Sequence, residues 1–255
     1  MTHSHEITIS GNHFTDTSGT AIQFGDLYIG PPEFMNHDSV IKDNYIHDTP
    51  VEYQGGIGIV VGIAHGVTIS NNELDNLPYT AISVGWGNLV DVSQAAGAHG
   101  VHNNLVQRAV NHLCDGGSFY SAGIQDTSYV YDNVFLNQQR GLAALYLDHW
   151  SAYYQVYNNV IFDNLSLTAR INPGEFPNQQ QNNVTANYWQ DRGMVTPPCV
   201  TTSYPDILVT GPPGQVHDNT VITALNQAPA SILDEAGLED TYEDIKVLPQ
   251  LPPWP

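Results

Sequence analysis

Two aspartates at the edges of short apolar runs are candidates for acid–base chemistry by a pair of carboxyl groups. Asp115 opens the run DGGSFY, and Asp148 closes the run LYLD further along the chain. Hydrolysis of a glycosidic bond uses one protonated carboxyl as general acid and one ionised carboxylate as base or nucleophile. Because aspartate before Gly-Gly commonly forms a turn, and aspartate at a strand end commonly caps one, a structural role is the alternative for both residues.

Polar and aromatic residues elsewhere in the chain are candidates for holding a sugar beside these aspartates. Aromatic rings stack on sugars, although in repeat proteins they often fill the core instead. Histidines tune neighbouring acids or bond hydroxyl groups, and a solvated turn residue is the alternative. The candidate substrate-binding residues are Glu52, Tyr53, Tyr79, His112, Tyr120, Tyr146, His149 and Trp150. For Glu52 and Tyr53, a position in a solvated loop is the alternative.

The elements that must position these residues follow from a repeated asparagine. It lies between apolar residues in eight similar contexts, at intervals of about 24 to 36 residues. Such a repeat indicates a structural unit that buries its apolar face only by stacking on its neighbours. Asparagine suits a turn between two strands because it tolerates left-handed backbone angles. The positions are Asn12, Asn44, Asn72, Asn104, Asn133, Asn159, Asn183 and Asn219.

A further run with the period-two pattern of a strand lies in most repeats. These runs are Thr20 to Phe24, Ile57 to Val61, Ala81 to Val84, Ser118 to Ser121 and Leu142 to Leu147. No helical stretch fits between them. We therefore predict an all-β fold, a single-stranded parallel β-helix of about eight coils with asparagine and aliphatic ladders inside. A β-sandwich also has short strands, but its strands do not repeat an asparagine in register.

Alternation along the strands predicts which side chains face outward. If Phe119, Leu145 and Leu147 point inward, then Ser118, Tyr120, Tyr146 and Asp148 share one outer face. On that face Asp148 would be exposed to a ligand. The direction of Asp115 stays open, because the paired glycines that follow it interrupt the alternation.

The charge balance restricts the partners. The chain has 26 acidic residues and six lysines and arginines, a net charge of −20. This excess of negative charge predicts no binding to nucleic acid, which draws on clustered cations. It also disfavours lyases of acidic polysaccharides, although calcium could share the work of the missing cations. We expect a neutral polysaccharide or oligosaccharide as partner and no cofactor, with calcium as the alternative.

The chain length and composition predict a single domain over residues 1–255, with 228–255 as a C-terminal cap or tail. Ala230 to Ala236, followed by Gly237, predicts a short helix that caps the last coil. No apolar run is long enough to span a membrane. The first residues do not form a signal peptide. We therefore expect a secreted or cell-surface protein whose leader is absent, or a fragment of a longer chain.

Two further expectations concern the first coil and the cysteines. Because Met1 enters the first repeat without a covering helix, the N-terminal coil face should self-associate or be covered by additional chain. The two cysteines, Cys114 and Cys199, are too far apart in sequence for a zinc pattern, and their pairing stays open.

Several segments also resemble a known group of proteins. IGIVVGIAHGVTISNNELDNLPYTAISVGWG, followed by CDGGSFYS and ALYLDHWS, resembles the right-handed parallel β-helix proteins of the pectate-lyase-like superfamily. The similarity runs from about His5 to Lys246 and is greatest to β-helix glycoside hydrolases of the α-L-fucosidase and xylanase type. The resemblance implies that Asp115 and Asp148 are the catalytic carboxylates. His149 stands where these relatives usually carry glutamate, so a non-catalytic glycan-binding or structural β-helix of a cell surface or phage is the alternative.

Overall fold

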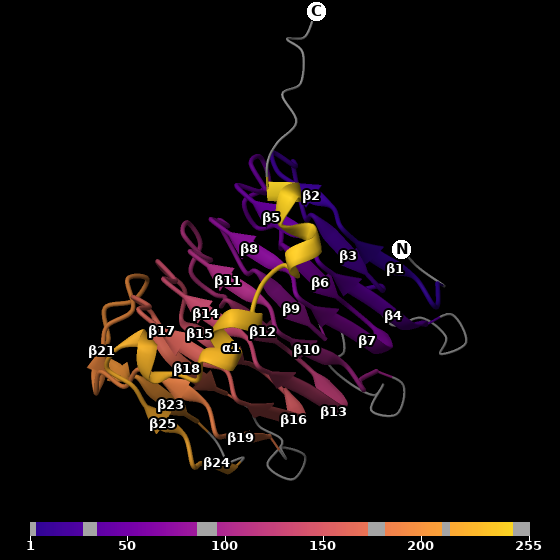
Figure 1. Cartoon of the computed structure of the whole chain (residues 1–255). Helices are drawn as coiled ribbons and strands as arrows, with labels where there is room; N and C mark the ends of the chain where they lie inside the picture. Colours follow the sequence, from indigo (N-terminus) through magenta and orange to yellow (C-terminus); the bar gives the residue numbers. More distant parts are fainter. Residues whose placement is uncertain (1–3, 28–34, 86–95, 173–181, 211–214, 247–255) are drawn as a thin grey trace, which may run out of the picture.

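The computed structural model describes residues 4–27, 35–85, 96–172, 182–210 and 215–246, and it shows three long sheets of parallel strands (Figure 1). Sheet A contains β1 (Thr8–Ser10), β4 (Asn36–Lys42), β7 (Ala64–Ser70), β10 (Gly100–His102), β13 (Ile124–Tyr131), β16 (Ala152–Tyr157), β19 (Asn183–Thr185) and β24 (Gln215–His217). Sheet B contains β2 (His13–Phe14), β5 (Tyr45–His47), β8 (Glu73–Asp75), β11 (Leu105–Gln107), β14 (Val134–Leu136), β17 (Val160–Phe162), β20 (Tyr188–Trp189) and β25 (Thr220–Val221). Sheet C contains β3 (Ile22–Phe24), β6 (Ile59–Val61), β9 (Ile82–Val84), β12 (Phe119–Ser121), β15 (Ala143–Leu147), β18 (Leu167–Ile171) and β23 (Ile207–Val209).

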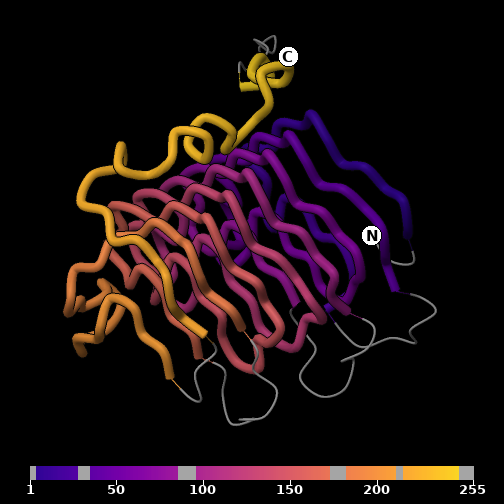
Figure 2. Tube along the Cα trace, turned by 60° about the horizontal axis from the view of Figure 1, so that its bottom comes forward, coloured from indigo at the N-terminus to yellow at the C-terminus, as the bar shows by residue number. Residues whose placement is uncertain are grey.

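The chain passes through sheets A, B and C in turn, and each strand pairs in parallel with its equivalent one coil later. The result is a right-handed solenoid of about seven turns, visible as successive loops of the tube in Figure 2. The prediction of a parallel β-helix is therefore confirmed. Within the described ranges, the one antiparallel ribbon pairs β21 (Met194–Val195) with β22 (Tyr204–Pro205) beyond sheet C.

Buried asparagines form a continuous ladder along the turn between sheets A and B, as predicted. The Nδ2 atom of Asn104 donates to Oδ1 of Asn133 across 2.9 Å and to two backbone carbonyls. Its own Oδ1 accepts from the backbone and side chain of Asn72. The left-handed angle falls on the preceding residue, for example Asn103 with φ of 52°, and not on the ladder asparagine. The fully buried members are Asn44, Asn72, Asn104, Asn133, Asn159 and Asn187.

The seventh position of this ladder differs from the prediction. Asn187, and not Asn183, receives the bond from Asn159 and donates to Asn219. Asn183 begins β19 and donates to Oε1 of Gln155 on the outer side of sheet A. The pair Asn182-Asn183 imitates the local pattern of the ladder, but the register of the coil places the turn four residues later.

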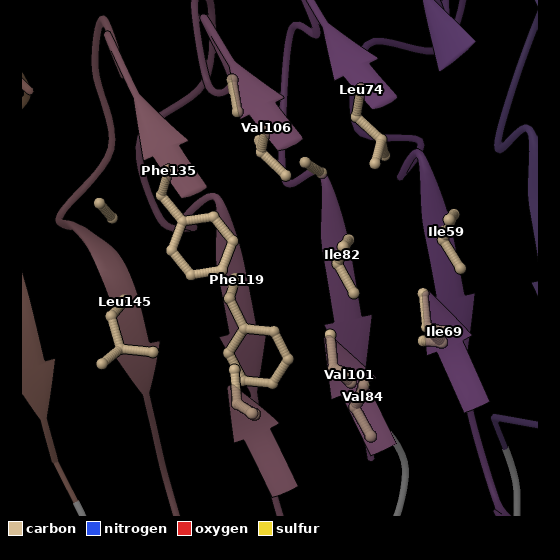
Figure 3. Close-up of a cluster of buried hydrophobic side chains, with 14 of the residues drawn as sticks. Ile59, Ile69, Leu74, Ile82, Val84, Val101, Val106, Phe119, Phe135 and Leu145 are labelled. Atoms are coloured by element: carbon tan, nitrogen blue, oxygen red, sulfur yellow. The ribbon is translucent and has the colours of Figure 1, made fainter. Parts of the chain in front are cut away.

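Aliphatic and aromatic side chains stack in rows inside the coil and form its core. Figure 3 shows Ile59, Ile82, Phe119 and Leu145 from consecutive strands of sheet C, in register with one another. All four are fully buried. The strands predicted for this sheet are confirmed, each beginning one or two residues later than expected. Ser118, expected on the outer face, is fully buried, and its backbone N–H and hydroxyl both donate to Oε1 of Gln138.

The C-terminal segment runs back along the outside of the coil. It contains η2 (Leu225–Gln227), α1 (Ala230–Glu235) and η3 (Asp240–Lys246), with Gly237 after the helix as predicted. Gly237 donates to the backbone of Asn103, and Lys246 pairs with Glu73 across 2.7 Å. The segment thus returns along the flank towards the first coils (Figures 1 and 2). The sequence predicted that it would cap the end of the last coil, and this placement is wrong. Residues 247–255 of the predicted tail lie outside the described ranges.

Candidate active site

Asp148 follows the last residue of β15 and lies on the outer side of sheet C. Alternation within the strand turns Leu147 inward and Tyr146 outward, so that Asp148 faces the same side as Tyr146. The expectation of an exposed carboxylate is wrong, however, because Asp148 is only 6% exposed. The outer face of sheet C is covered at this point, and the carboxylate lies in a nearly enclosed position.

Hydrogen bonds fix both oxygens of the Asp148 carboxylate. The hydroxyl of Tyr120 donates to Oδ2 across 2.8 Å, and the Nδ2 amide of Asn172 donates to Oδ1 across 2.8 Å. The hydroxyl of Thr210 donates to Oδ1 of Asn172 across 2.8 Å, which orients the amide nitrogen towards Asp148. His149 is mostly exposed, and its Nδ1 lies 3.6 Å from Oδ1 of Asp148. Two donors from two other coils therefore hold the carboxylate, and Thr210 from a third coil orients one of them.

Asp115 lies close enough to Asp148 for the two charges to interact, although no hydrogen bond joins them within the described part of the chain. Asp115 as a residue is exposed. Partial desolvation of its carboxyl, and then the negative charge of Asp148, raise the pKa of Asp115, whereas the positive charges of Arg170 and His149 oppose the shift. The two aspartates thus differ in environment, one open to solvent and the other enclosed and hydrogen-bonded.

Tyr79 fixes the backbone at Asp115. Its hydroxyl donates to the carbonyl oxygen of Asp115, and its ring lies against Gly116. A Cβ atom on Gly116 would lie 2.8 Å from that ring, so the close contact requires glycine here.

Aromatic rings and one arginine surround the carboxylates. The rings of Tyr120 and Tyr146 meet edge to face with centroids 5.2 Å apart, and the guanidinium of Arg170 lies 5.2 Å from the centre of the Tyr146 ring. Burial, and then the charge of Asp148, raise the pKa of both tyrosines. Both phenols therefore stay protonated and act as hydrogen-bond donors at neutral pH.

A disulfide ties the segment that carries Asp115 to the chain beyond sheet C. Cys114 pairs with Cys199, 85 residues later. Cys199 lies between β21 and β22, and Tyr204 and Val195 of that ribbon pack against the cluster that contains Tyr120 and Tyr146. The bond therefore joins Asp115 to a segment that helps to cover the outer face of sheet C.

The structure brings only some of the predicted binding residues to the aspartates. Tyr79, Tyr120, Tyr146 and His149 lie there, as described above. Within the described ranges, no contact joins Glu52, Tyr53 or His112 to either carboxylate: Tyr53 is 72% exposed, and His112 contacts Asn111. Trp150 follows His149 with a left-handed φ of 64° and is half-buried. Their roles in binding a sugar stay predictions.

Three residues at the site, Arg170, Asn172 and Thr210, were not singled out from the sequence. Arg170 is the register partner of Tyr146, and Leu208 is the partner of Arg170. Asp148 stands two residues after Tyr146, Asn172 two after Arg170, and Thr210 two after Leu208. These three side chains therefore occupy one outward column, each one coil from the next. The alternation that placed Asp148 would have placed Asn172 and Thr210 too, had strands β18 and β23 been recognised.

No group of three or more histidine, cysteine or acidic side chains suited to a metal ion occurs in the described ranges. Among the same residues, no helix has the length and apolar character that crossing a bilayer demands.

Comparison with known proteins supports the fold. Residues 1–106 match the family model described as the right handed beta helix region. A solved structure titled as a glycoside hydrolase superposes on 94% of this chain with a TM-score of 0.64 and 20% sequence identity, and the chain spans 36% of that protein. A curated UDP-N-acetylenolpyruvoylglucosamine reductase from Staphylococcus saprophyticus is 32% identical over 116 residues, which are 43% of this chain and 36% of the reductase. Because the chain covers about a third of each protein, neither activity carries over directly. The family model and the solved structure, together with the three parallel sheets, identify a right-handed parallel β-helix.

Proposed function

We propose that this protein is a glycoside hydrolase that acts on a neutral glycan through Asp115 and Asp148. The observation that carries the proposal is the unequal environment of two neighbouring carboxyls. Asp148 is enclosed and held by two donors, whereas Asp115 is open to solvent with a raised pKa. Two carboxyls in different environments suit the separate acid and base roles of glycoside hydrolysis. The solved glycoside hydrolase of similar fold supports the same activity class.

The roles follow from these environments. Asp115 acts as the general acid, because its raised pKa keeps a larger fraction of the carboxyl protonated. Asp148 acts as base or nucleophile, because Tyr120 and Asn172 hold its oxygens in a fixed direction. The exposed side of the pair, at Asp115 and His149, is where a sugar would enter.

A neutral substrate fits the charges around the pair. With a net charge of −20, the protein repels acidic polysaccharides. Arg170 is the one lysine or arginine whose charge acts on Asp115 among the described residues. Its guanidinium already packs on the Tyr146 ring.

Release of reducing sugar across a panel of neutral polysaccharides tests the proposal. The wild type should release sugar from at least one of them, and Asp115→Asn and Asp148→Asn should each reduce turnover by a factor of about 10² or more. Asp148→Asn should stay folded, because its amide oxygen can accept from Asn172 while its amide nitrogen donates to the Tyr120 hydroxyl. Full activity of both variants would contradict the proposed mechanism.

A non-catalytic glycan-binding β-helix is the second candidate. The burial of Asp148 favours it, because a carboxylate with both oxygens bonded resembles a structural turn residue. In that case no polysaccharide in the panel releases sugar. Asp148→Asn would then lower the free energy of unfolding by about 1 kcal/mol or more and leave glycan binding intact.

We propose further that the protein works outside the cytosol and self-associates through its first coil. A disulfide such as Cys114–Cys199 forms and persists in oxidising compartments. Within the described ranges, strands β1, β2 and β3 each pair with one neighbouring strand, and their other edges offer backbone groups to a second copy. Light scattering should therefore give a mass above that of a monomer, and a stable monomer would contradict the association.

A further inference from the structure

A cavity lies between helix α1 and the turns that join sheets A and B, away from both aspartates. Its volume is about 290 Å³. The wall on the coil side comes from four consecutive coils, and the wall on the other side comes from the C-terminal segment, which lies along the flank in Figure 2. The lining residues are Asn103, Asp132, Asn158, Tyr188, Pro229, Ser231, Ile232 and Glu235.

The repeat itself places polar side chains in a row here. Asn103, Asp132 and Asn158 each precede a ladder asparagine and have left-handed φ angles of 52°, 53° and 56°. Because the ladder residue points into the coil, the residue before it points outward. The residues just before them, His102, Tyr131 and Tyr157, are direct register partners, so the three polar groups are one coil apart. Equivalent positions in adjacent strands lie about 4.8 Å apart.

The helix supplies an apolar surface and two further polar groups. Ile232 is 7% exposed and packs on the cluster that contains Val134 and Val160. Tyr188 packs against the same cluster and turns part of its surface to the cavity. Ser231 and Glu235 are exposed and complete the polar rim. Burial raises the pKa of Asp132, and the negative charge of the nearby Glu235 raises it further by a smaller amount.

This lining selects a ligand class. None of the eight lining residues is lysine, arginine or histidine, which disfavours phosphate, sulfate or uronate groups. Amide and hydroxyl donors stand beside carboxylate and amide acceptors, and a ligand rich in hydroxyl groups uses both kinds. Tyr188, Pro229 and Ile232 offer an apolar surface for the C–H face of a ring. The volume lies just below the range for small-molecule pockets, about 300–1,000 Å³, and suits a ligand of one ring.

We propose that this cavity is a second, non-catalytic binding site for one neutral sugar residue. It lies on the turn between sheets A and B, whereas Asp115 and Asp148 lie at sheet C, so the site does not depend on the proposed hydrolase activity. A glycan held here would be anchored to the flank of the coil while the outer face of sheet C stays accessible.

Saturation-transfer NMR and calorimetry with methyl glycosides of glucose, galactose, xylose, arabinose and fucose test the site, with putrescine as a competing cationic probe. At least one glycoside should bind at millimolar concentration. Asp132→Asn and Glu235→Gln should each weaken binding by about tenfold or more, because each removes an acceptor from the rim. Ser231→Tyr should abolish binding by filling the space.

Two controls keep the outcome specific. Asp234→Asn removes a neighbouring carboxylate of α1 that does not line the cavity, and it should bind as the wild type does. The double variant Asp115→Asn with Asp148→Asn should also retain binding, which separates this site from the proposed active site. The proposal is overturned if no glycoside binds, if putrescine binds in preference to every sugar, or if Asp234→Asn weakens binding as much as Glu235→Gln does.

Discussion

The phenol of Tyr120 donates a hydrogen bond to Oδ2 of Asp148 across 2.8 Å, from one coil to the next. The strands that carry them, β12 and β15, pair in register, with Tyr120 opposite Tyr146. Asp148 stands two residues after Tyr146, on the same outward side. The contact therefore depends on the stacking of adjacent coils, and it orients a carboxylate that would otherwise be an ordinary residue at a strand end.

Replacement of Tyr120 by phenylalanine tests whether that orientation matters for activity. A hydrogen bond to a charged group contributes about 1.5–3 kcal/mol, so kcat/KM of Tyr120→Phe should fall on the order of 10- to 100-fold. The ring contact with Tyr146 is retained. Tyr157→Phe, which removes a phenol from the outer face of sheet A, is the matched control and should keep full activity. Equal losses in the two variants would argue against a specific role of Tyr120.

The hydroxyl of Thr210 should act on Asp148 through Asn172. Thr210→Val keeps the shape of the side chain but removes the donor to Oδ1 of Asn172, so the amide loses its fixed orientation. We expect kcat to fall by about 3- to 10-fold with KM unchanged, since a neutral hydrogen bond contributes about 0.5–1.5 kcal/mol. Thr210→Ser retains the hydroxyl and should restore the rate. If serine is as slow as valine, the hydroxyl is not the cause.

The repeat could be predicted from sequence because its physical causes are local. A buried asparagine at a turn and aliphatic residues at alternate positions leave a pattern in every coil. The Asn183 error shows the limit of that approach, since two adjacent asparagines fit the local pattern and only the register of the coil selects Asn187. The burial of Asp148 was missed for a related reason. Alternation gives the side of the sheet to which a residue points, but not what covers that side.

The raised pKa of Asp115 predicts that activity and stability both fall as pH rises. Activity should fall as pH rises through this pKa, because the general acid loses its proton. Below pH 3.8, the ordinary pKa of an aspartate, Asp115 is protonated in both folded and unfolded chains and does not affect stability. Above it the unfolded chain ionises more readily, so the charged carboxyl disfavours folding.

Asp115→Asn should therefore unfold at a higher temperature than the wild type at neutral pH, and the difference should vanish below pH 3.8. Thermal unfolding of both proteins across this range measures the effect. Asp16→Asn, at an exposed turn of the first coil, makes the same change of charge far from Asp148 and serves as the control. A wild type more stable than Asp115→Asn at neutral pH would contradict the direction of the shift.

The asparagine ladder should carry a large share of the stability of the coil. Asn104→Ala removes three donated bonds and two accepted ones, and it leaves the carbonyls of Ile69 and His102 without their amide partner inside the coil. Buried polar groups without partners cost about 1–3 kcal/mol each. We expect the free energy of unfolding to fall by about 2–4 kcal/mol, a large part of the total for a typical domain.

Asn183 and Asn187 provide a matched comparison within one coil. Asn187→Ala should destabilise the protein by about as much as Asn104→Ala does, because it breaks the bonds to Asn159 and Asn219. Asn183→Ala should cost less than about 1 kcal/mol, since it loses a single bond to Gln155 on the half-buried outer side of sheet A. Chemical denaturation of the three variants and the wild type gives the values. If Asn183→Ala proves the more damaging of the two, the register of this coil, and with it the placement of the ladder, is wrong.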